Sequence, residues 1–553
     1  MTINAAQLMV RCLEAEQVEY IFGIPGEENL NVMDALLDSS IQFVCTRHEQ
    51  GAAFMADVYG RLTGKAGVCM STLGPGATNL ITGVADANMD RAPVVAIAGQ
   101  AATSRMHKES HQVVDLVSMF RPISKYSAQI LEPETTPEVI RKAFKQAQSE
   151  KPGACFIDFP ENVAKMPTHA TPLPISEPLR SGAHPEVRDQ ALALIKQAKH
   201  PLILAGNGII RARAEDKLLA FAETFHLPVV NTFMAKGVIS FKHELAIGTA
   251  GLQSGDYQNC GFELADVIIC IGFDMAEYHP RVWHASRDRT IIHIDSQPAE
   301  VDDAYIPSVE ILGDIYRNLE LMTNTHRGES DWQASIPKRD LTPYRNLRHA
   351  LIHEMKQHAK SSDWPLKPQK IIWDLRTAMA LDDIAVCDVG AHKMWMARMF
   401  RCEVSNTCII SNGFASMGIA LPGVIAAKLA YPEKAAVAVT GDAGFLMNVQ
   451  ELETAVRLGL SLVVLIWNDS GYGLIRWKQE REFGRSAFVE FNNPDFVQLA
   501  QSFGAVGVRI ESADDLLPTL QQALAHQGVT VIDCPVDYRE NSQLVARLGQ
   551  VLE

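Results

Sequence analysis

The sequence lacks the features that mark membrane-bound or secreted proteins. No apolar run in its 553 residues is long enough to span a bilayer. Its start, MTINAAQLMV, has no basic segment followed by an apolar core, so we expect no secretion signal. The ten cysteines are scattered and never form a CxxC pair. Together these absences predict a cytoplasmic protein whose cysteines stay reduced and serve as small apolar residues.

Positive charge is also scarce. The chain has 50 Lys and Arg against 65 Asp and Glu, which gives a formal net charge of −15. Because an acidic protein is poorly suited to polyanions, we expect neither nucleic acid nor a membrane as a partner. Apolar material is present in ordinary amounts, since 47% of the residues are hydrophobic and 21% are charged. This composition and length predict a globular protein of three or four domains.

Short apolar runs rich in β-branched residues alternate with helix-like segments along the whole chain. The runs are apolar throughout rather than alternately polar, which is typical of strands covered by helices on both faces. The sequence therefore predicts an α/β fold with parallel sheets. The clearest runs are residues 42–46, 93–99, 201–206, 266–272, 290–295, 435–441, 460–468 and 529–536.

Two segments have the composition of linkers. Residues 165–186 are rich in proline, serine and threonine, and residues 324–370 are polar with one helical stretch inside. Dividing the chain there predicts three doubly wound parallel-sheet domains, at residues 1–165, 186–323 and 365–553. The first and third share a layout of strand, glycine loop and small-residue helix. This layout hints at related domains, although many α/β domains have it.

One candidate site lies around VTGDAGF, residues 439–445, which places Asp442 between two glycines after an apolar run. The next run ends in Asn468 and Asp469, and Asp469 lies 469 − 442 = 27 residues beyond Asp442, the length of one crossover between neighbouring strands. Both turns are then expected at the carboxyl ends of adjacent strands, where α/β proteins bind ligands. Two oxygen ligands so placed suit Mg²⁺, which shares its remaining positions with water and phosphate. The alternative is a capping aspartate followed by an ordinary turn.

GDAGF followed by NDSGYG resembles the magnesium–diphosphate motif of thiamine diphosphate enzymes. Other segments that fit this family are GIPGEENL (23–30), RHEQGAAFMADVYGRLTGKAG (47–67), GPGATN (74–79) and DVGAHKMWMAR (388–398). The resemblance covers the whole chain and is greatest to acetolactate synthases, in particular their FAD-free catabolic branch. It implies that the three domains are pyrimidine-binding, central and diphosphate-binding, in that order.

The resemblance also implies a site for thiamine diphosphate and Mg²⁺. Glu49 is the implied catalytic residue and would hydrogen-bond a ring nitrogen of the cofactor pyrimidine. Read without the family, it is a solvated residue at a helix start. The implied metal ligands are Asp442, Asp469 and the backbone oxygen of Gly471. Implied cofactor contacts are Gly390, Ala391, His392, Gly413, Ala415, Met417, Gly441, Ala443, Gly444, Asn468, Tyr472, Gly473 and Leu474.

The resemblance implies an assembly and excludes one cofactor. In the family, the pyrimidine and the diphosphate are held by different subunits, which implies a homodimer or homotetramer with active sites at subunit interfaces. FAD is not expected, because residues 273–288 lack the arginine-containing signature of the biosynthetic synthases. They resemble instead the catabolic EY-x-P pattern, at Glu277, Tyr278 and Pro280. A glycine turn within residues 203–216 is weak evidence for a dinucleotide, so we expect a structural central domain.

The substrates implied are small 2-oxo acids, bound by a partly unusual set of residues. His111 and Gln112 match an HQ pair of the catabolic branch and would contact the acceptor. Lys125 would line the same approach, and Gly26 is also assigned to the substrate site. Without the family pattern, the HQ pair would be read as a surface loop.

Two segments that would overhang the reacting carbon depart from the catabolic pattern. Phe414 and Ala415 stand where catabolic synthases usually have a glutamine pair. Lys478, beside Trp477, stands where they have a glutamine. We expect Phe414, Trp477 and Lys478 to line a reshaped acceptor site.

The expected activity is a decarboxylating carboligation, in which an acetolactate synthase condenses two pyruvates to 2-acetolactate and carbon dioxide. A less selective acceptor site would make the protein a 2-oxo acid decarboxylase that releases an aldehyde. The paired histidines of dedicated decarboxylases are, however, absent from the first domain. A non-catalytic thiamine diphosphate-binding protein is disfavoured by Glu49, because binding alone does not need that acid.

Overall fold

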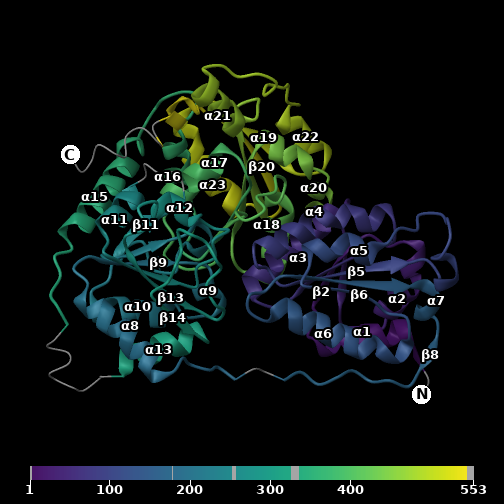
Figure 1. The fold of residues 1–553 in the computed structure, drawn as a ribbon. Helices are drawn as coiled ribbons and strands as arrows, with labels where there is room; N and C mark the ends of the chain where they lie inside the picture. The colour runs from purple at the N-terminus through teal and green to yellow at the C-terminus, as the bar shows by residue number, and fades with distance from the viewer. Residues whose placement is uncertain (1–2, 177–178, 252–256, 326–335, 543, 545–553) are drawn as a thin grey trace.

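The computed structural model describes residues 3–176, 179–251, 257–325, 336–542 and 544. Over these residues, the chain forms three six-stranded sheets with parallel neighbours and one two-stranded antiparallel pair. Helices flank each large sheet, and the three domains lie at the corners of a triangle, with the third domain at the top of Figure 1. The prediction of an α/β fold with three doubly wound parallel sheets is confirmed.

The first domain is built on the sheet β3-β2-β4-β5-β7-β6. Its amino-terminal strand β1 (Ile3–Asn4) pairs with β8 (Pro167–Thr168), which closes the domain on itself. The strands of the sheet are β2 (Tyr20–Gly23), β3 (Gln42–Cys45), β4 (Gly67–Ser71), β5 (Val94–Gln100), β6 (Tyr126–Gln129) and β7 (Ala154–Pro160). The helices are α1 (Ala5–Ala15), α2 (Leu30–Leu36), α3 (Glu49–Thr63), α4 (Pro75–Met89), α5 (Leu116–Phe120), α6 (Thr136–Gln148) and α7 (Glu161–Ala164).

The central domain is built on the sheet β11-β10-β9-β12-β13-β14. Its strands are β9 (Pro201–Ala205), β10 (Val229–Asn231), β11 (Ala246–Thr249), β12 (Val267–Ile271), β13 (Thr290–Asp295) and β14 (Val309–Leu312). The helices are α8 (Pro185–Gln197), α9 (Gly208–Arg211), α10 (Glu215–Phe225), α11 (Tyr257–Leu264), α12 (Pro280–Trp283) and α13 (Ile315–Asn324). The helix expected inside the second linker is α15 (Thr342–Gln357), which buries Tyr344, Leu347 and Leu351.

The third domain is built on the sheet β16-β15-β17-β18-β20-β19. Its strands are β15 (Ile384–Cys387), β16 (Cys408–Ile410), β17 (Ala436–Gly441), β18 (Leu462–Asn468), β19 (Val506–Arg509) and β20 (Val529–Pro535). The helices are α16 (Pro368–Ala378), α17 (Ala391–Met399), α18 (Ala420–Ala430), α19 (Asp442–Met447), α20 (Glu451–Arg457), α21 (Gly473–Phe483), α22 (Phe496–Ser502) and α23 (Leu516–Ala525).

The first and third sheets have the same topology. With the six strands of each sheet numbered in chain order, both read 2-1-3-4-6-5, whereas the central sheet reads 3-2-1-4-5-6. The shared layout seen in the sequence therefore extends to the whole strand order. Each order has a point where the connections diverge to opposite sides, and that point is the usual ligand crevice of such sheets.

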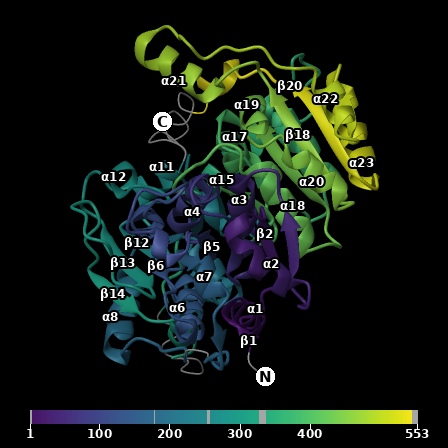
Figure 2. The ribbon, with the colours of Figure 1, turned by 90° about the vertical axis from the view of Figure 1, so that its right-hand side faces the viewer.

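The first and third domains share one apolar core, in which α3 lies against α18 (Figures 1 and 2). Phe54 and Val58 of α3 pack with Val424 and Ile425 of α18 in this core. The helices approach closely at Gly423, where an added Cβ would lie 2.9 Å from Val58 Cγ2. Because this contact is buried and apolar, it fixes the orientation of the first domain relative to the third.

Candidate active site at the edge of the third sheet

The third sheet has its switch point between β15 and β17. Gly390 caps α17 in the loop after β15, and Gly441, the last residue of β17, caps α19. The next strand in the sheet, β18, ends at Asn468. The GDAGF and NDSGYG segments therefore lie at adjacent strand ends, as their spacing predicts.

Two carboxylates lie at these strand ends. Asp442 is 1% exposed, and its Oδ2 accepts a hydrogen bond from the backbone N–H of Ser470 at 2.7 Å, which ties the two turns together. Burial raises the pKa of Asp442. Burial, and then the charge of Asp442, raise the pKa of Asp469 to about 7. A pair of carboxylates in this state favours a cation beside it.

Arg476 is the cation that the chain itself places at this pair. It lies in the first turn of α21, with Nη1 3.2 Å from Asp469 Oδ2. Gly471 approaches the same guanidinium, since an added Cβ there would lie 2.3 Å from Arg476 Nη2. The backbone oxygen of Gly471 accepts from the N–H of Gly473 at 3.0 Å. The turn that carries Asp469 and Gly471 is thus packed against the guanidinium of Arg476.

His392 lies on the other side of the switch point. It is 2% exposed, and burial lowers the pKa of its imidazole to about 3, so the ring is neutral at physiological pH. Its Nε2 is buried and has no hydrogen-bond partner among the described residues. Gly390 and Gly441 both approach the ring, because added Cβ atoms would lie 2.8 Å and 3.4 Å from its Cε1. A buried nitrogen without a partner implies a group that completes its hydrogen bond.

These features fit a diphosphate held with a divalent cation. The neutral imidazole of His392 and the buried Ala391 lie near one loop, and the carboxylates of Asp442 and Asp469 lie at the next. The N–H of Ala443 donates to Asp442 Oδ1 at 2.8 Å, so in this structure it bonds the carboxyl group of its neighbour. When bound, Mg²⁺ would be held by oxygen ligands, which are the ligands it prefers.

Asp442 begins the first of two short helices. α19 ends at Met447, and α20 begins at Glu451. Asn448 leaves helical geometry, and its Nδ2 donates to the backbone oxygen of Gly418 at 2.9 Å. Gly444 lies in α19 against Asp388, since an added Cβ would be 3.0 Å from Asp388 Oδ1.

Sequence analysis missed two residues that shape this edge. Asn493 donates from Nδ2 to Asp442 Oδ2 at 2.8 Å and to Asn468 Oδ1 at 3.0 Å. Asp388 is buried and accepts from the N–H of Gly418 at 2.9 Å. Asp388 stood in a family segment and could have been proposed. Asn493 lies 51 residues beyond Asp442, and no local pattern points to it.

The loop between β16 and α18 carries three further implied cofactor contacts, Gly413, Ala415 and Met417. Met417 is half-buried, and Phe414 is 45% exposed. Ala415 has a φ of +59°, a left-handed conformation that a residue with a Cβ adopts only when its surroundings hold it there. Gly413 donates from its N–H to Asp90 Oδ1 at 2.5 Å, so the first domain contacts this loop.

Glu49 is the first residue of α3 and is 8% exposed. Asn79 donates from Nδ2 to Glu49 Oε2 at 2.9 Å. Asn79 stood in the GPGATN segment, yet sequence analysis gave it no role. Gly76 lies close to the other oxygen, where an added Cβ would be 3.3 Å from Glu49 Oε1. Glu49 is therefore a buried acid rather than a solvated residue. Its Oε2 accepts a hydrogen bond from Asn79, and its Oε1 lies beside the backbone of Gly76.

Of the four substrate residues assigned to the first domain, Gly26, His111 and Gln112 lie near the segment that follows β4. His111 and Gln112 are exposed, and the backbone of Gln112 lies beside Gly74, where an added Cβ would be 2.7 Å from the Gln112 oxygen. Gly26 lies against Thr72, 2.4 Å from its Cβ by the same measure. These residues follow the carboxyl ends of strands of the first sheet.

Lys125 is placed elsewhere. It precedes β6 at the opposite, amino edge of the first sheet. Its Nζ donates to the backbone oxygens of Ser149 at 2.8 Å and Lys151 at 2.7 Å. The expectation that Lys125 lines the substrate approach is therefore not met within this chain, because its ammonium group caps a loop beneath the sheet.

A cavity of about 980 Å³ lies beside the metal turn, under α21. Asp469, Gly473, Arg476 and Trp477 line one part of it, and residues 536–539 with Asn541 line another. Glu49 is not among its lining residues. The α21 residues Leu474, Trp477 and Lys478 are half-buried, buried and exposed, in that order, and Tyr472 before the helix is 39% exposed.

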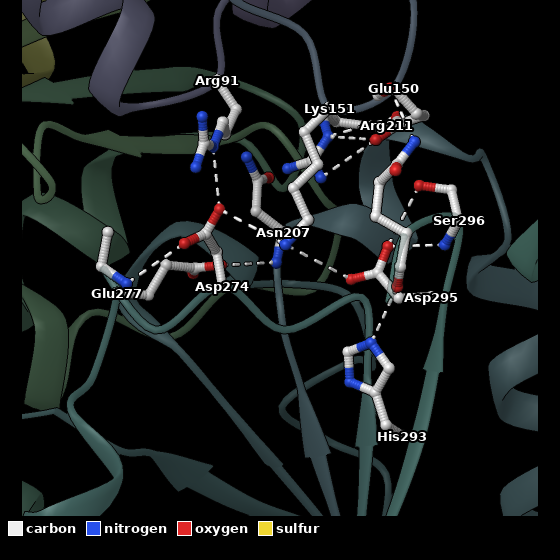
Figure 3. Close-up of polar contacts among 12 residues, drawn as sticks. Arg91, Glu150, Lys151, Asn207, Arg211, Asp274, Glu277, His293, Asp295 and Ser296 are labelled. Atoms are coloured by element: carbon white, nitrogen blue, oxygen red, sulfur yellow. Dashed lines mark hydrogen bonds and ion pairs between the residues drawn. The ribbon is translucent and has the colours of Figure 1, made fainter. Parts of the chain in front are cut away.

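Polar side chains of the chain itself reach into the crevice at the switch point of the central sheet (Figure 3), where a cavity of about 270 Å³ remains beside Arg91, Asn207 and Arg211. The backbone N–H of Asn207, in the glycine turn after β9, donates to Glu277 Oε1 at 3.2 Å. Burial raises the pKa of Glu277 to about 7. Arg91 of the first domain pairs with Asp274 at 2.8 Å, and Arg211 pairs with Glu150 at 3.2 Å. A carboxyl group thus occupies the turn where a dinucleotide-binding domain would present its backbone to phosphate.

Comparison with known proteins agrees with this geometry. The family models for thiamine pyrophosphate enzymes match in all three domains: the N-terminal TPP binding domain at residues 3–119, the central domain at 188–322 and the C-terminal TPP binding domain at 388–534. The chain belongs to the thiamine pyrophosphate enzyme family. The family expected from the motifs is confirmed.

Within that family the chain is similar over its whole length to acetolactate synthases. It is 38% identical to an acetolactate synthase of Bacillus subtilis, over 98% of this chain and 95% of that protein. It is 36% identical to a catabolic acetolactate synthase of Raoultella terrigena, over 99% and 97%. It is 35% identical to a probable acetolactate synthase large subunit of Methanococcus aeolicus, over 97% and 92%. Among the described residues, no helix is long and apolar enough to cross a membrane.

Proposed function

We propose that this chain is a thiamine diphosphate- and Mg²⁺-dependent acetolactate synthase that condenses two pyruvates to 2-acetolactate and carbon dioxide. One observation carries the proposal: Asp442 and Asp469 lie together at adjacent strand ends, across the switch point from His392, whose Nε2 has no partner within the described part of the chain. Whole-length similarity to named acetolactate synthases supports the choice of reaction within the family.

The diphosphate and its metal would be held by the third domain. Asp442, Asp469 and the backbone oxygen of Gly471 would bind Mg²⁺, and His392 with Gly390 would face the diphosphate. When bound, thiamine diphosphate supplies the electron sink that lets the bond beside a keto group break and form. The same edge would contribute Gly441, Gly444 and Asn468, with Met417 and Leu474 as apolar contacts.

Glu49 would orient the pyrimidine ring of the cofactor and share a proton with one of its ring nitrogens. Because Asn79 occupies Oε2 at 2.9 Å, Oε1 is the atom left to share a proton with a ring nitrogen. Burial makes this hydrogen bond stronger than it would be in water, because solvent does not compete for the proton. The carboxyl group would therefore hold a proton at a fixed position rather than exchange it freely.

We propose that no FAD binds. The support is the turn after β9 in the central domain, where Glu277 accepts from both Asn207 N–H and the hydroxyl of Thr232. A dinucleotide there would have to displace a buried carboxyl group and the ion pairs of Arg91 and Arg211. The central domain would then serve as structure.

We also propose that the active sites form between two copies of the chain, in a homodimer or homotetramer. Glu49 and the carboxylate pair belong to different domains, and the cavity beside the pair does not reach Glu49. Large apolar side chains around the cofactor edge are exposed in the single chain, as expected of a surface that a second copy covers. They are Phe414, Met447, Tyr472, Ile475, Phe483 and Phe488.

The substrates would be small 2-oxo acids, in a cytoplasmic enzyme. The exposed ammonium group of Lys478 would attract the acceptor carboxylate, and Phe414 with Trp477 would give the site its apolar walls. His111, Gln112 and Gly26 would approach from the first domain. Domain boundaries at 1–165, 186–323 and 365–553 complete the proposal.

Incubation of the purified protein with pyruvate, thiamine diphosphate and Mg²⁺ tests the reaction. We expect 2-acetolactate and carbon dioxide as products. Acetaldehyde without acetolactate would reject the synthase and leave a decarboxylase.

Replacement of Glu49 tests the role of the acid. We expect Glu49→Gln to lower kcat at least a hundredfold while cofactor binding persists, because the amide cannot share its proton in the same way. Glu138→Gln, at the exposed first turn of α6, is the matched control and should retain activity. Equal activity of the two variants would reject the catalytic role.

A further inference from the structure

Three aspartates are fully buried where the first domain meets the loop of residues 411–417. Asp57 lies on α3, Asp86 lies on α4, and Asp90 caps the end of α4, and each is 0% exposed. We call these three residues the acid cluster. The reaction proposed above gives them no role, yet buried carboxylates are costly unless they are paired or hydrogen-bonded.

Asp86 holds two residues of the loop. Ser411 donates from Oγ to Asp86 Oδ1 at 2.9 Å, and Ser416 donates from its backbone N–H to the same oxygen at 3.1 Å. The two donors lie at the two ends of the loop. One carboxylate therefore fixes the distance between the loop's start and its end.

Asp90 holds the residues between them. The backbone N–H of Asn412 donates to Asp90 Oδ2 at 3.1 Å, and that of Gly413 donates to Oδ1 at 2.5 Å. Gly413 can approach so closely because it lacks a Cβ, which would lie 2.8 Å from Asp90 Oδ1. Asn412 also donates from its side chain to the backbone oxygen of Glu277, so the loop meets the central domain as well.

Two buried cations hold the carbonyl groups of the same segment. Arg61 pairs with Asp90 at 3.2 Å and donates to the backbone oxygen of Ile410 at 2.9 Å. Lys393 donates from Nζ to the backbone oxygen of Ser411 at 2.9 Å. The segment is therefore held by acceptors on its N–H groups and donors on its carbonyl groups, all from buried charges.

The charges of this network balance with one proton. Three carboxylates face two cations, so one carboxyl group must be protonated for the buried network to be neutral. Burial and the neighbouring Asp86 raise the pKa of Asp57 well above its usual range. Neither oxygen of Asp57 has a hydrogen-bond donor among the described residues, so a proton on Asp57 that is donated to Asp86 completes the network.

We propose that Asp86 and Asp90 are positioning residues that set the conformation of the 411–417 loop from the first domain of the same chain. The loop carries Gly413, Ala415 and Met417, whose cofactor contacts rest on the proposed function. Ala415 has its left-handed φ of +59° between the two held ends of the loop. Strained backbone of this kind persists only where neighbours over-determine it, and the hydrogen bonds to Asp86 and Asp90 do so.

Hydrogen–deuterium exchange of the full chain without cofactor tests the proposal directly. We expect Asp86→Asn and Asp90→Asn to speed exchange in peptides that cover residues 408–420 at least tenfold. Asp383→Asn is the matched control, because Asp383 is a buried aspartate that caps Ala380 and Ala435 N–H groups away from the loop. Unchanged exchange in the loop, in variants with native circular dichroism, would overturn the proposal.

Cofactor affinity is the second measurement. Titration with thiamine diphosphate and Mg²⁺, followed by tryptophan fluorescence, should give at least tenfold weaker binding in Asp86→Asn and Asp90→Asn. Asp383→Asn should bind as wild type does. Loosened exchange with unchanged affinity would overturn the positioning role. If wild type itself bound no thiamine diphosphate, the proposed function would fail while the exchange result still judged the loop.

A milder variant keeps the test decisive if the aspartate variants do not fold. Ser411→Ala removes one of the two hydrogen bonds to Asp86 Oδ1 and leaves both charges in place. We expect a twofold to fivefold increase in loop exchange and a decrease in cofactor affinity of similar size. No change in either quantity would overturn the proposal.

Discussion

Replacing Arg476 with alanine should strengthen Mg²⁺ binding. In this structure, the guanidinium lies 3.2 Å from Asp469 Oδ2, and its side chain is 26% exposed against 10% for Asp469. Two unit charges at about this distance attract by roughly 1 kcal/mol in a water-like medium and by several times more in a protein-like one. A metal ion that binds Asp469 must weaken this pair and accept a positive neighbour. Removing the cation should therefore favour Mg²⁺ by at least about 1.4 kcal/mol, or tenfold.

The assay is isothermal titration of the cofactor-saturated protein with Mg²⁺. Arg485→Ala is the control. Arg485 is exposed just beyond α21, so this substitution removes the same charge from the same region. A tenfold gain in Arg476→Ala alone supports competition between arginine and metal. Weaker binding in Arg476→Ala would refute it, and would mean that the guanidinium holds Asp469 in the orientation that the metal needs.

Two further predictions concern buried titratable groups. His392→Ala should weaken thiamine diphosphate binding about tenfold, because a hydrogen bond is lost. Burial lowers the pKa of His392 to about 3, so the affinity of the wild type should not change between pH 5 and 8 through titration of this residue. Measuring the affinity of both proteins across that pH range checks both expectations. Burial raises the pKa of Asp158 to about 7, so the folded state holds a proton that the unfolded chain releases near pH 4. Stability should therefore fall as pH rises from about 4 through 7, by up to about 1.4 kcal/mol per pH unit, and Asp158→Asn should flatten this profile. Thermal melts between pH 5 and 8 measure it, and parallel profiles for the two proteins would contradict the assignment.

The fold was predictable where the signal was local. All eight apolar runs named from the sequence are strands, because a strand buried on both faces must be apolar at every position. β7 (Ala154–Pro160) was missed despite full burial, since Asp158 interrupts its apolar pattern. β10 (Val229–Asn231) is too short to stand out in a sequence. It is recognised as a strand because it pairs with β9 on one side and β11 on the other.

Only the site residues that lie within local sequence motifs could be predicted. Asp442 and Asp469 follow strands of one crossover, so their spacing alone placed them together. Asn493 bonds Asp442 from a distant loop, and Asp86 meets Ser411 across a separation of 325 residues, so neither contact leaves a pattern in the sequence. Lys125 had no strand-end position to support its assignment, and it lies at the opposite edge of its sheet.

The position of Glu49 is set by the third domain of its own chain. Glu451, at the start of α20, is 0% exposed and accepts from the backbone N–H groups of Arg47 at 3.1 Å and His48 at 3.0 Å. α20 follows α19, whose first residue is Asp442. If a second copy supplies the diphosphate edge that Glu49 faces, each third domain has two tasks: it holds its own cofactor tail, and it fixes the acid that serves the other copy. The shared core between α3 and α18 makes these tasks inseparable, because neither helix can shift without the other.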